Sequence, residues 1–200
     1  MHATAAHASD TAAVPETATD ASLQLQEAQP EPPLVTALDI RVGKIIQIDE
    51  HPDADSLYVE SIDVGEEEPR TIVSGLVQYV PKDALLEKLV VVLCNLKPRN
   101  MRGIKSNGML LCASNDAHDR VEPLVPPETA VVGERVFFDG TAGTQPDPES
   151  PNKVQKKKIW EAVQSDLKTN AECQAGYKGL AMQTSAGQVS ANSLASAGIS

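Results

Sequence analysis

Apolar and polar side chains alternate along short segments in the middle of the chain. In LDIRVGKIIQID, which begins at residue 38, the apolar side chains of one parity are Leu38, Ile40, Val42, Ile46 and Ile48. Such alternation is typical of a strand with one face in a protein core. Arg41 lies on the opposite face and is predicted to point outward. Lys44 interrupts the apolar parity directly after Gly43, which predicts a β-bulge or a bend there.

Further segments of this kind continue to residue 140. LYVESIDVG, RTIVSGL, LVVVLCNL, GMLLCAS and GERVFFD are each predicted to be strands. HPDADS, residues 51–56, has the composition of a solvated turn, and PKDALLEKL, residues 81–89, predicts a short helix that begins at its Pro. Five or six short strands, with one helix between the third and fourth, predict a mainly β fold, the five-stranded barrel called the OB-fold.

The two ends of the chain differ from this middle part, residues 38–140. Residues 1–37 are rich in Ala, Thr, Pro and acids and have no sustained apolar period, which predicts a disordered acidic tail. Residues 141–200 begin with the Pro-rich linker GTAGTQPDPESPN and are predicted to form a C-terminal extension. The apolar pattern weakens again after residue 171.

One helix is predicted inside the extension. Ile159, Val163 and Leu167 follow one another at intervals of four residues, which places them on one face of an amphipathic helix. Ser150 is a candidate N-cap, and Pro151 suits the first helical position.

Charge is unevenly distributed along the 200 residues, whose formal net charge is -11. The tail holds five acids and no Lys or Arg, whereas the extension holds six bases and five acids. The chain has no apolar run of about eighteen residues and no signal-peptide pattern, so neither a membrane span nor secretion is predicted. The three cysteines lack metal-ligand spacing and are expected to be free thiols in a reducing compartment, the cytoplasm.

No segment shows a catalytic or cofactor-binding motif. VSGL around Ser74 lacks the second Gly of a nucleophile elbow, and no phosphate-binding Gly loop is present. His51, Asp53 and Asp55 lack the Gly and the terminal Glu of a calcium loop, so a solvated turn is the preferred interpretation. The sequence therefore predicts no metal site, no cofactor and no enzyme.

The segment NLKPRNMRGIKSNGML, residues 95–110, gathers positive charge in this acidic chain. Its four cations are Lys97, Arg99, Arg102 and Lys105. The intervening Asn, Ser and Gly residues offer neutral donors and exposed backbone N–H groups to phosphate, and glycines permit close approach of a polyanion. Two interpretations remain: a nucleic-acid contact surface, or a solvated loop whose cations only keep the chain soluble.

The aromatic content bears on the kind of nucleic acid. Single-strand binders on OB-folds stack bases on aromatic side chains, but the predicted barrel offers only Tyr58, Tyr79, Phe137 and Phe138. Phosphate and ribose contacts on a folded RNA, with shape recognised more than sequence, suit this composition better.

Five segments together resemble a known family. LDIRVGKI, HPDADSLYVE, RTIVSGL, LCNLKPRNMRGIKSNGMLLCAS and VGERVFFDG are similar, in this order, to the tRNA-binding domain of endothelial-monocyte-activating polypeptide II, of synthetase cofactors and of C-terminal modules of methionyl- and tyrosyl-tRNA synthetases. The resemblance continues through KKKIWEAVQSDLKTNAEC, YKG and SAGIS, which are similar to the C-terminal extension of the polypeptide II branch.

The resemblance implies a non-catalytic OB-fold that binds tRNA by its shape and assists an aminoacyl-tRNA synthetase, with the methionyl and tyrosyl enzymes as candidates. It also implies that the extension mimics a second subunit and packs on the barrel, which would make the chain a pseudo-dimeric monomer. Matched position by position, it places tRNA contacts at Arg41, Lys44, Asn95, Lys97, Arg99, Arg102, Lys105, Ser106 and Asn107.

Three points stay open at the level of sequence. A protein-interaction module, chaperone-like or signalling, would use the same fold through an apolar groove. An enzyme would need a buried carboxylate or His that the sequence does not reveal. Lys153, Lys156, Lys157 and Lys158 form either a second electrostatic site or the solvated face of a helix.

Overall fold

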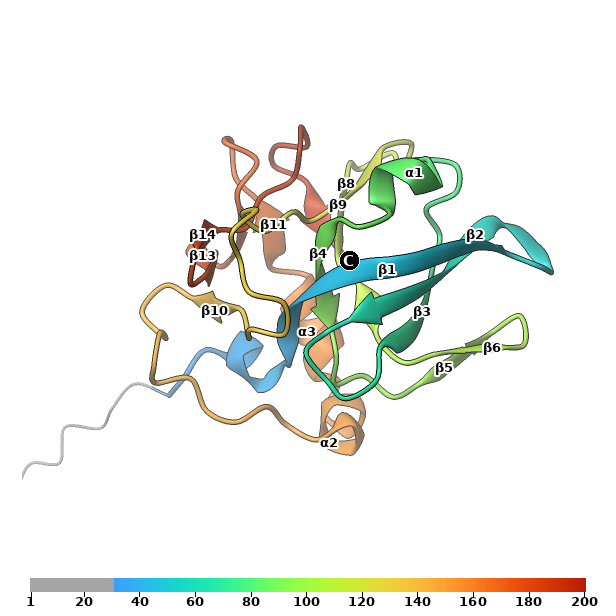
Figure 1. The fold of residues 1–200 in the computed structure, drawn as a ribbon. Coiled ribbons are helices and arrows are strands. Elements are labelled where there is room, and N and C mark those ends of the chain that lie inside the picture. Colours follow the sequence, from blue (N-terminus) through green and yellow to red (C-terminus); the bar gives the residue numbers. More distant parts are fainter. Residues whose placement is uncertain (1–30) are drawn as a thin grey trace, which may run out of the picture. The chain divides into compact units, whose positions relative to one another are not determined.

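Two antiparallel sheets joined through residues 109–114 organise residues 31–200, the part of the chain that the computed structural model describes (Figure 1). In the first sheet the strand order is β3 (Arg70–Ser74), β2 (Ala54–Asp63), β1 (Ile40–His51), β4 (Leu89–Leu93) and β7 (Met109–Leu110). In the second the order is β10 (Phe137–Phe138), β13 (Leu180–Thr184), β12 (Ala175–Tyr177), β11 (Leu167–Thr169), β15 (Gly198–Ile199), β8 (Cys112–Ser114) and β9 (Val121–Pro123), and β14 (Gly187–Gln188) pairs with β13.

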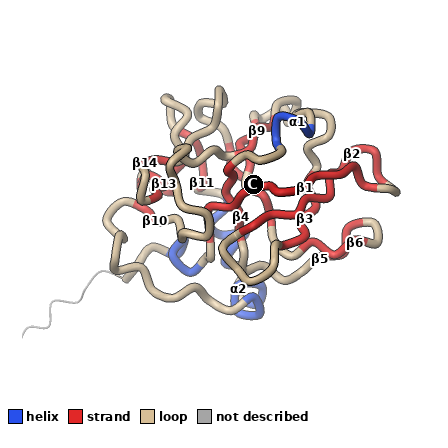
Figure 2. The backbone as a smooth tube through the Cα atoms, viewed as in Figure 1, coloured by secondary structure: helices blue, strands red, loops and turns tan. Residues whose placement is uncertain are grey.

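A separate two-stranded hairpin and four short helices complete the fold. The hairpin consists of β5 (Arg99–Met101) and β6 (Ile104–Ser106). The helices are the 3-10 helix η1 (Leu34–Ala37), α1 (Lys82–Leu85), α2 (Pro151–Lys156) and α3 (Ile159–Gln164). The predicted mainly β fold is therefore confirmed, and strands dominate the view in Figure 2.

The first sheet curls so that its outer strand approaches the chain beyond β6. The amide of Asn107 donates a hydrogen bond to the carbonyl of Thr71 in β3, at 2.8 Å. The predicted closed barrel of five strands remains a prediction, because the chain leaves β7 at Leu111 and continues into the second sheet.

Strand β1 contains a bulge, but not where the sequence predicted it. Gly43 pairs regularly with Val90, and a Cβ there would lie only 2.8 Å from a methyl group of Ile62, so this glycine serves close packing. The register shifts between Ile45 and Gln47 instead. Ile46 is the extra residue and stays 41% exposed, while Ile45 takes the core position that the parity had assigned to Ile46.

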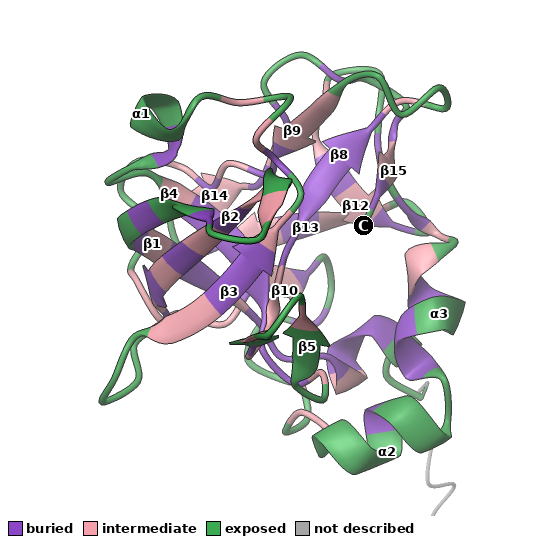
Figure 3. Cartoon of the chain, turned by 90° about the vertical axis from the view of Figure 1, so that its right-hand side faces the viewer, coloured by how far each residue is buried: buried purple, intermediate pink, exposed green. Residues whose placement is uncertain are grey.

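Two buried clusters lie on the two sides of β4. One fills the curled first sheet and includes Ile62, Val92 and Cys94. The other lies between the two sheets and α3, and it includes Leu111 and Val163. In Figure 3, β8 is coloured as buried along its length, whereas α2 carries mainly exposed residues. Cys94 and Cys112 pack in this interior, and burial raises the pKa of both thiols.

The extension, residues 141–200, contributes to the second cluster. Its last strand, β15, pairs with β8, and Ser200 exchanges two backbone hydrogen bonds of 2.9 Å with Cys112. The end of the chain is thus part of the sheet. The weak apolar pattern after residue 171 belongs to four short strands, which alternate too briefly to give a periodic signal.

The predicted helix of the extension is broken in two. Ser150 caps α2 by accepting a hydrogen bond from the amide of Lys153, and Pro151 occupies the first turn, as predicted. Lys158 then adopts a left-handed conformation with φ of 50°, which ends α2 and redirects the chain into α3. Leu167, predicted to lie on the same helix, begins β11.

Two other sequence interpretations need correction. Leu34–Ala37, assigned to the tail, form η1, and buried Val35 belongs to the core cluster around α3, so ordered structure begins earlier than predicted. The rest of the predicted disordered tail, residues 1–30, lies outside the described residues. The solvated turn HPDADS is shorter than predicted, because His51 ends β1 and is only 4% exposed.

Candidate nucleic-acid interface

The four cations of residues 97–105 lie on and beside the β5–β6 hairpin. Its two-residue turn consists of Arg102 and Gly103, with φ of 52° and 95°. Positive φ at both central positions is the geometry of the type I′ turn, which matches the natural twist of paired strands. The side chain of Asn100 supports the turn by accepting a hydrogen bond of 2.8 Å from the amide of Gly103.

The hairpin presents these cations to solvent on more than one side. Arg99 pairs with Ser106 and Asn100 with Lys105, so Arg99 and Lys105 project from opposite faces of the ribbon. Lys97, Arg99, Arg102 and Lys105 are all exposed, and none forms an ion pair with a carboxylate among residues 31–200. Their charge is therefore available to a ligand.

A buried histidine anchors this hairpin to its neighbour, the β1–β2 hairpin. The Nδ1 atom of His51 accepts a hydrogen bond of 3.0 Å from the amide of Asp53. Its Nε2 atom therefore carries the proton and donates to the carbonyl of Met101, also at 3.0 Å. His51 thus has a positioning role that its place in HPDADS did not reveal.

Asn95 and Ser106 lie inside the protein instead of on the predicted surface. The Asn95 amide accepts from the backbone of Asp39 at 2.9 Å and donates to the carbonyls of Ala37 and Glu149. The Ser106 hydroxyl accepts from the amide of Val73 and donates to the carbonyl of Gly108, both at 3.0 Å. Their polar groups are already used by the fold, so both residues support the cationic segment from within.

Asn107 lies at the junction between the hairpin and β3. Its backbone donates to Thr71, and its carbonyl accepts a hydrogen bond of 2.8 Å from Arg70. Arg70 also donates to the carbonyl of Cys94 at 2.6 Å, which ties both ends of the cationic segment to one guanidinium. The sequence offered no signal for this role of Arg70, because it depends on contacts between distant segments.

The predicted contacts in β1 differ from those on the hairpin because they are paired with acids. Arg41 donates from Nε and Nη2 to the two oxygens of Asp39, each at 2.9 Å, and lies 3.6 Å from Glu66. These hydrogen bonds raise the pKa of the guanidinium, although its partial burial acts to lower that pKa. Lys44 forms an ion pair with Glu87. Both cations therefore have a local counter-charge, unlike the four of the hairpin.

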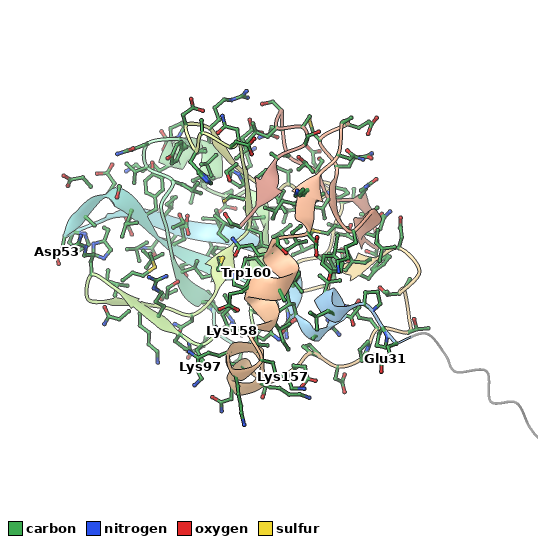
Figure 4. The ribbon with its side chains drawn as sticks, turned by 180° about the vertical axis from the view of Figure 1, so that it is seen from behind. Glu31, Asp53, Lys97, Lys157, Lys158 and Trp160 are labelled. Carbon is green, nitrogen blue, oxygen red and sulfur yellow. The ribbon has the colours of Figure 1, made fainter. Side chains whose placement is uncertain are left out.

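A hollow of about 520 Å³ lies between the hairpin and the helices of the extension. Trp160 lines it from α3, and Lys97 and Arg99 line it from the hairpin side. Figure 4 shows Lys97 in the same region as Lys157 and Lys158, around α2 and below Trp160. The sequence predicted the helix that carries Trp160 but not this neighbourhood, which only the tertiary fold creates.

One buried carboxylate was also missed. Glu60 in β2 is 1% exposed, accepts a hydrogen bond of 2.7 Å from Ser74, and has a second oxygen without a partner among the described residues. Burial raises its pKa to about 7. The sequence did contain a signal, because Glu60 shares the parity of the apolar Tyr58 and Ile62.

Residues 31–200 offer neither a metal-ligand cluster nor a membrane-spanning helix. No group of three or more His, Cys, Asp or Glu side chains is arranged to hold a metal ion there. No helix in that range is long and apolar enough to cross a membrane.

Comparison with known proteins relates this geometry to a family. The model of a putative tRNA-binding domain matches residues 40–135. The crystal structure of the C-terminal domain of Plasmodium vivax p43 superimposes with a TM-score of 0.75 at 36% identity, over 83% of this chain and 98% of that chain.

Two longer curated relatives are similar over most of this chain. Cytoplasmic tyrosine–tRNA ligase of Gallus gallus is 49% identical over 187 residues, which make up 93% of this chain and 35% of that protein. Aminoacyl tRNA synthase complex-interacting multifunctional protein 1 of Cricetulus griseus is 50% identical over 182 residues, or 88% of this chain and 49% of that protein. The chain thus spans half or less of the length of these relatives.

Proposed function

The chain belongs to the family of putative tRNA-binding domains, and on that premise we propose that it binds folded tRNA and assists an aminoacyl-tRNA synthetase. The observation that carries the proposal is the β5–β6 hairpin, whose four exposed cations have no carboxylate partner among the described residues. We propose a binding role without catalysis, because the matched region is a binding domain in relatives that are themselves ligases.

The proposed contacts are to the phosphate backbone. Arg99, Arg102 and Lys105 project in different directions from the β5–β6 hairpin, and Lys97 lies just before it. The four cations therefore suit a curved, folded phosphate surface more than a flat one. Such contacts position an RNA without reading its bases. The internal bonds of Asn95 and Ser106 hold this hairpin in place, and Arg41 and Lys44 would contribute only after leaving their acidic partners.

The proposed protein partner follows from the relatives. One is named as a protein that interacts with an aminoacyl tRNA synthase complex. A tyrosine–tRNA ligase and a probable methionine–tRNA ligase also carry a similar segment. We propose that this chain supplies the same tRNA-binding segment to a synthetase, with the tyrosyl and methionyl enzymes as the first candidates and the cytoplasm as the place of action.

We also propose that the chain acts as a monomer. The extension pairs β15 with β8 and contributes to the core cluster around Leu111. This is the packing expected if the extension takes the place of a second subunit, as the resemblance implies. Sedimentation equilibrium should then give a mass near 21.3 kDa at micromolar concentration. A mass twice as large would contradict the pseudo-dimeric arrangement.

The function is tested by tRNA binding across a salt series, followed by fluorescence anisotropy of labelled tRNA. If four cations meet phosphates, log K should fall with log salt at a slope of about -3 to -4. Replacing Lys97, Arg99, Arg102 and Lys105 with Ala should abolish this binding.

The matched control removes four other exposed cations, Lys82, Lys88, Lys168 and Lys178, and thereby the same net charge. This control should keep most of the affinity, because those residues lie away from the hairpin. Equal loss in both variants, or binding that is insensitive to salt, would contradict the proposal and favour a protein-interaction role.

A further inference from the structure

The hollow beside the cationic hairpin has an apolar floor. Its apolar lining comes from five elements and the loop before β5: Val73, Leu96, Met101, Met109, Val154 and Trp160. Methionine side chains adapt their shape to a flat guest, and Trp160 is the one indole in the chain. A volume of about 520 Å³ lies within the range of small-ligand sites, roughly 300–1,000 Å³.

The rim of the same hollow is mostly basic. Lys97 and Arg99 line it on the hairpin side, and Glu161 is the one acid among its lining residues. Gln155 of α2 adds a neutral donor and acceptor at the opposite side, and the exposed Lys156, Lys157 and Lys158 follow it directly in the chain. Lys97 and Arg99 are thus the cations that an anion at the rim would meet.

A second hollow shows that a basic rim is not a general feature of the hollows in this structure. It lies between α1 and β9, has a volume of about 450 Å³, and is also floored by apolar side chains such as Leu85 and Val125. Its rim carries Glu87, Glu122 and Glu128 against a single Lys88. A polyanion would be repelled there, whereas the hollow beside the hairpin attracts one.

From these observations we propose that the hollow lined by Trp160 binds one unpaired nucleotide of an RNA strand. The base enters the apolar floor beside Trp160 and the two methionines. The flanking phosphates lie at the rim, beside Lys97 and Arg99. The inference rests on the proposed function, and it adds a contact to an unpaired base to the phosphate contacts of the hairpin.

The hairpin and the hollow would contact different parts of an RNA, because their side chains differ in chemistry. The hairpin has cations but no aromatic residue, so it holds phosphates of any sequence. The hollow has an indole beside basic side chains, and single-strand binders combine aromatic side chains with a basic groove to hold bases with little sequence preference. A folded RNA with an unpaired end or an extruded base would satisfy both surfaces at once.

The single tryptophan provides a direct probe of this hollow. The full chain is titrated with the single-stranded RNA hexamer A6, with a blunt 12-base-pair RNA duplex and with tRNA, and the fluorescence of Trp160 is recorded with the anisotropy of each labelled RNA. We expect A6 and tRNA to quench Trp160 saturably. The duplex should bind through the hairpin without changing the fluorescence.

A carboxylate introduced at the rim of the hollow tests whether the nucleotide binds there. Gln155→Glu introduces a carboxylate at an exposed residue of the hollow and should weaken A6 binding about fivefold to tenfold. Asn152→Glu makes the same change of charge on α2 outside the hollow and should weaken it less than twofold. Trp160→Ala is avoided, because Trp160 is 9% exposed and its loss would disturb the core.

The outcomes separate this inference from the proposed function. If tRNA binds in a hairpin-dependent manner but neither A6 nor tRNA changes Trp160 fluorescence, the hollow is not a nucleotide site and the tRNA-binding proposal stands. If Asn152→Glu and Gln155→Glu weaken A6 binding equally, A6 does not bind in the hollow. If A6 quenches Trp160 and tRNA does not bind, the nucleotide site stands and recognition of folded tRNA fails.

Discussion

The β1–β2 and β5–β6 hairpins are neighbours with opposite charge. The tip of the first carries the exposed acids Asp49, Glu50, Asp53 and Asp55, and no Lys or Arg occurs between residues 45 and 69. The second carries four exposed cations, and no Asp or Glu occurs between residues 95 and 115. They project from the same side of the fold (Figure 1). The side chain of His51 in the first hairpin donates a hydrogen bond to Met101 of the second.

The difference shows how an acidic protein keeps a positive surface. No ion pair joins the two hairpins among the described residues, so the acids do not neutralise the cations. The electrostatic field around the two hairpins is asymmetric. It attracts an RNA to the cationic second hairpin and repels it from the acidic first hairpin. We infer that this orients the ligand toward α2 and away from the first hairpin.

Reversing the charge of the second hairpin should have the largest effect on binding. Replacing Lys97, Arg99, Arg102 and Lys105 with Glu would make both hairpins repel phosphate, and we expect tRNA affinity to fall by more than about a hundredfold at low salt. Anisotropy of labelled tRNA gives the measurement. Circular dichroism should remain unchanged, because all four side chains are exposed. A loss of less than tenfold would show that the hairpin is not the main contact.

Glu60 gives the first hairpin a pH dependence that the second lacks. Its pKa is raised to about 7 in the folded protein from 4.5, so the folded state binds the proton more tightly. Its stabilising contribution is complete below pH 4.5 and is lost as the pH rises through 7. Glu60→Gln should therefore raise the free energy of unfolding by up to about 3 kcal/mol at pH 8 and by little at pH 4.

Urea denaturation at the two pH values measures this effect. Glu50→Gln is the matched control, because Glu50 is exposed on the same hairpin and its replacement makes the same chemical change outside the core. Equal stabilisation of Glu60→Gln at both pH values would mean that Glu60 does not titrate within the buried site.

Breaking the link between the hairpins should have an intermediate effect. His51→Leu keeps most of the volume but removes the bond to Met101, and we expect a loss of about 1–2 kcal/mol of stability. Hydrogen exchange at the amides of β5 and β6 should accelerate, and tRNA affinity should fall severalfold because the cations lose their fixed positions. Unchanged exchange in that hairpin would show that His51 does not hold it.

Neutralising the first hairpin should have the smallest effect and the opposite sign. Replacing Asp49, Asp53 and Asp55 with Asn and Glu50 with Gln removes repulsion without adding a contact. We expect tRNA affinity to rise about twofold to fivefold at low salt and hardly at 0.5 M salt, where screening is strong. A matched set of exposed acids elsewhere, Asp116, Asp119, Glu128 and Glu172, shows whether the effect depends on proximity to the second hairpin or on net charge alone. Equal gains in affinity would mean that only net charge matters.

The comparison also shows why the sequence predicted parts of this site and missed others. The cations of residues 97–105 are visible in the sequence because they are closely spaced and no acid lies among them. The roles of Asn95 and Ser106 are not visible, because each depends on a partner at least thirty-three positions away. The burial of Glu60 could have been predicted, because Glu60 has the same parity as apolar residues of its strand. An isolated acid in a strand is nevertheless a weak signal until the strand is known to face a core.

By itself, the sequence determined the mainly β architecture, the short helix after Pro81, the cap at Ser150 and the cationic segment, because each depends on neighbours within a few residues. Only the tertiary structure decided the bulge at Ile46, the break at Lys158 and the pairing of the chain end with β8. It alone also brought Trp160 beside Lys97 and Arg99. These features arise from packing between distant segments, where a shift of one residue or a single left-handed position satisfies a core that local periodicity cannot describe.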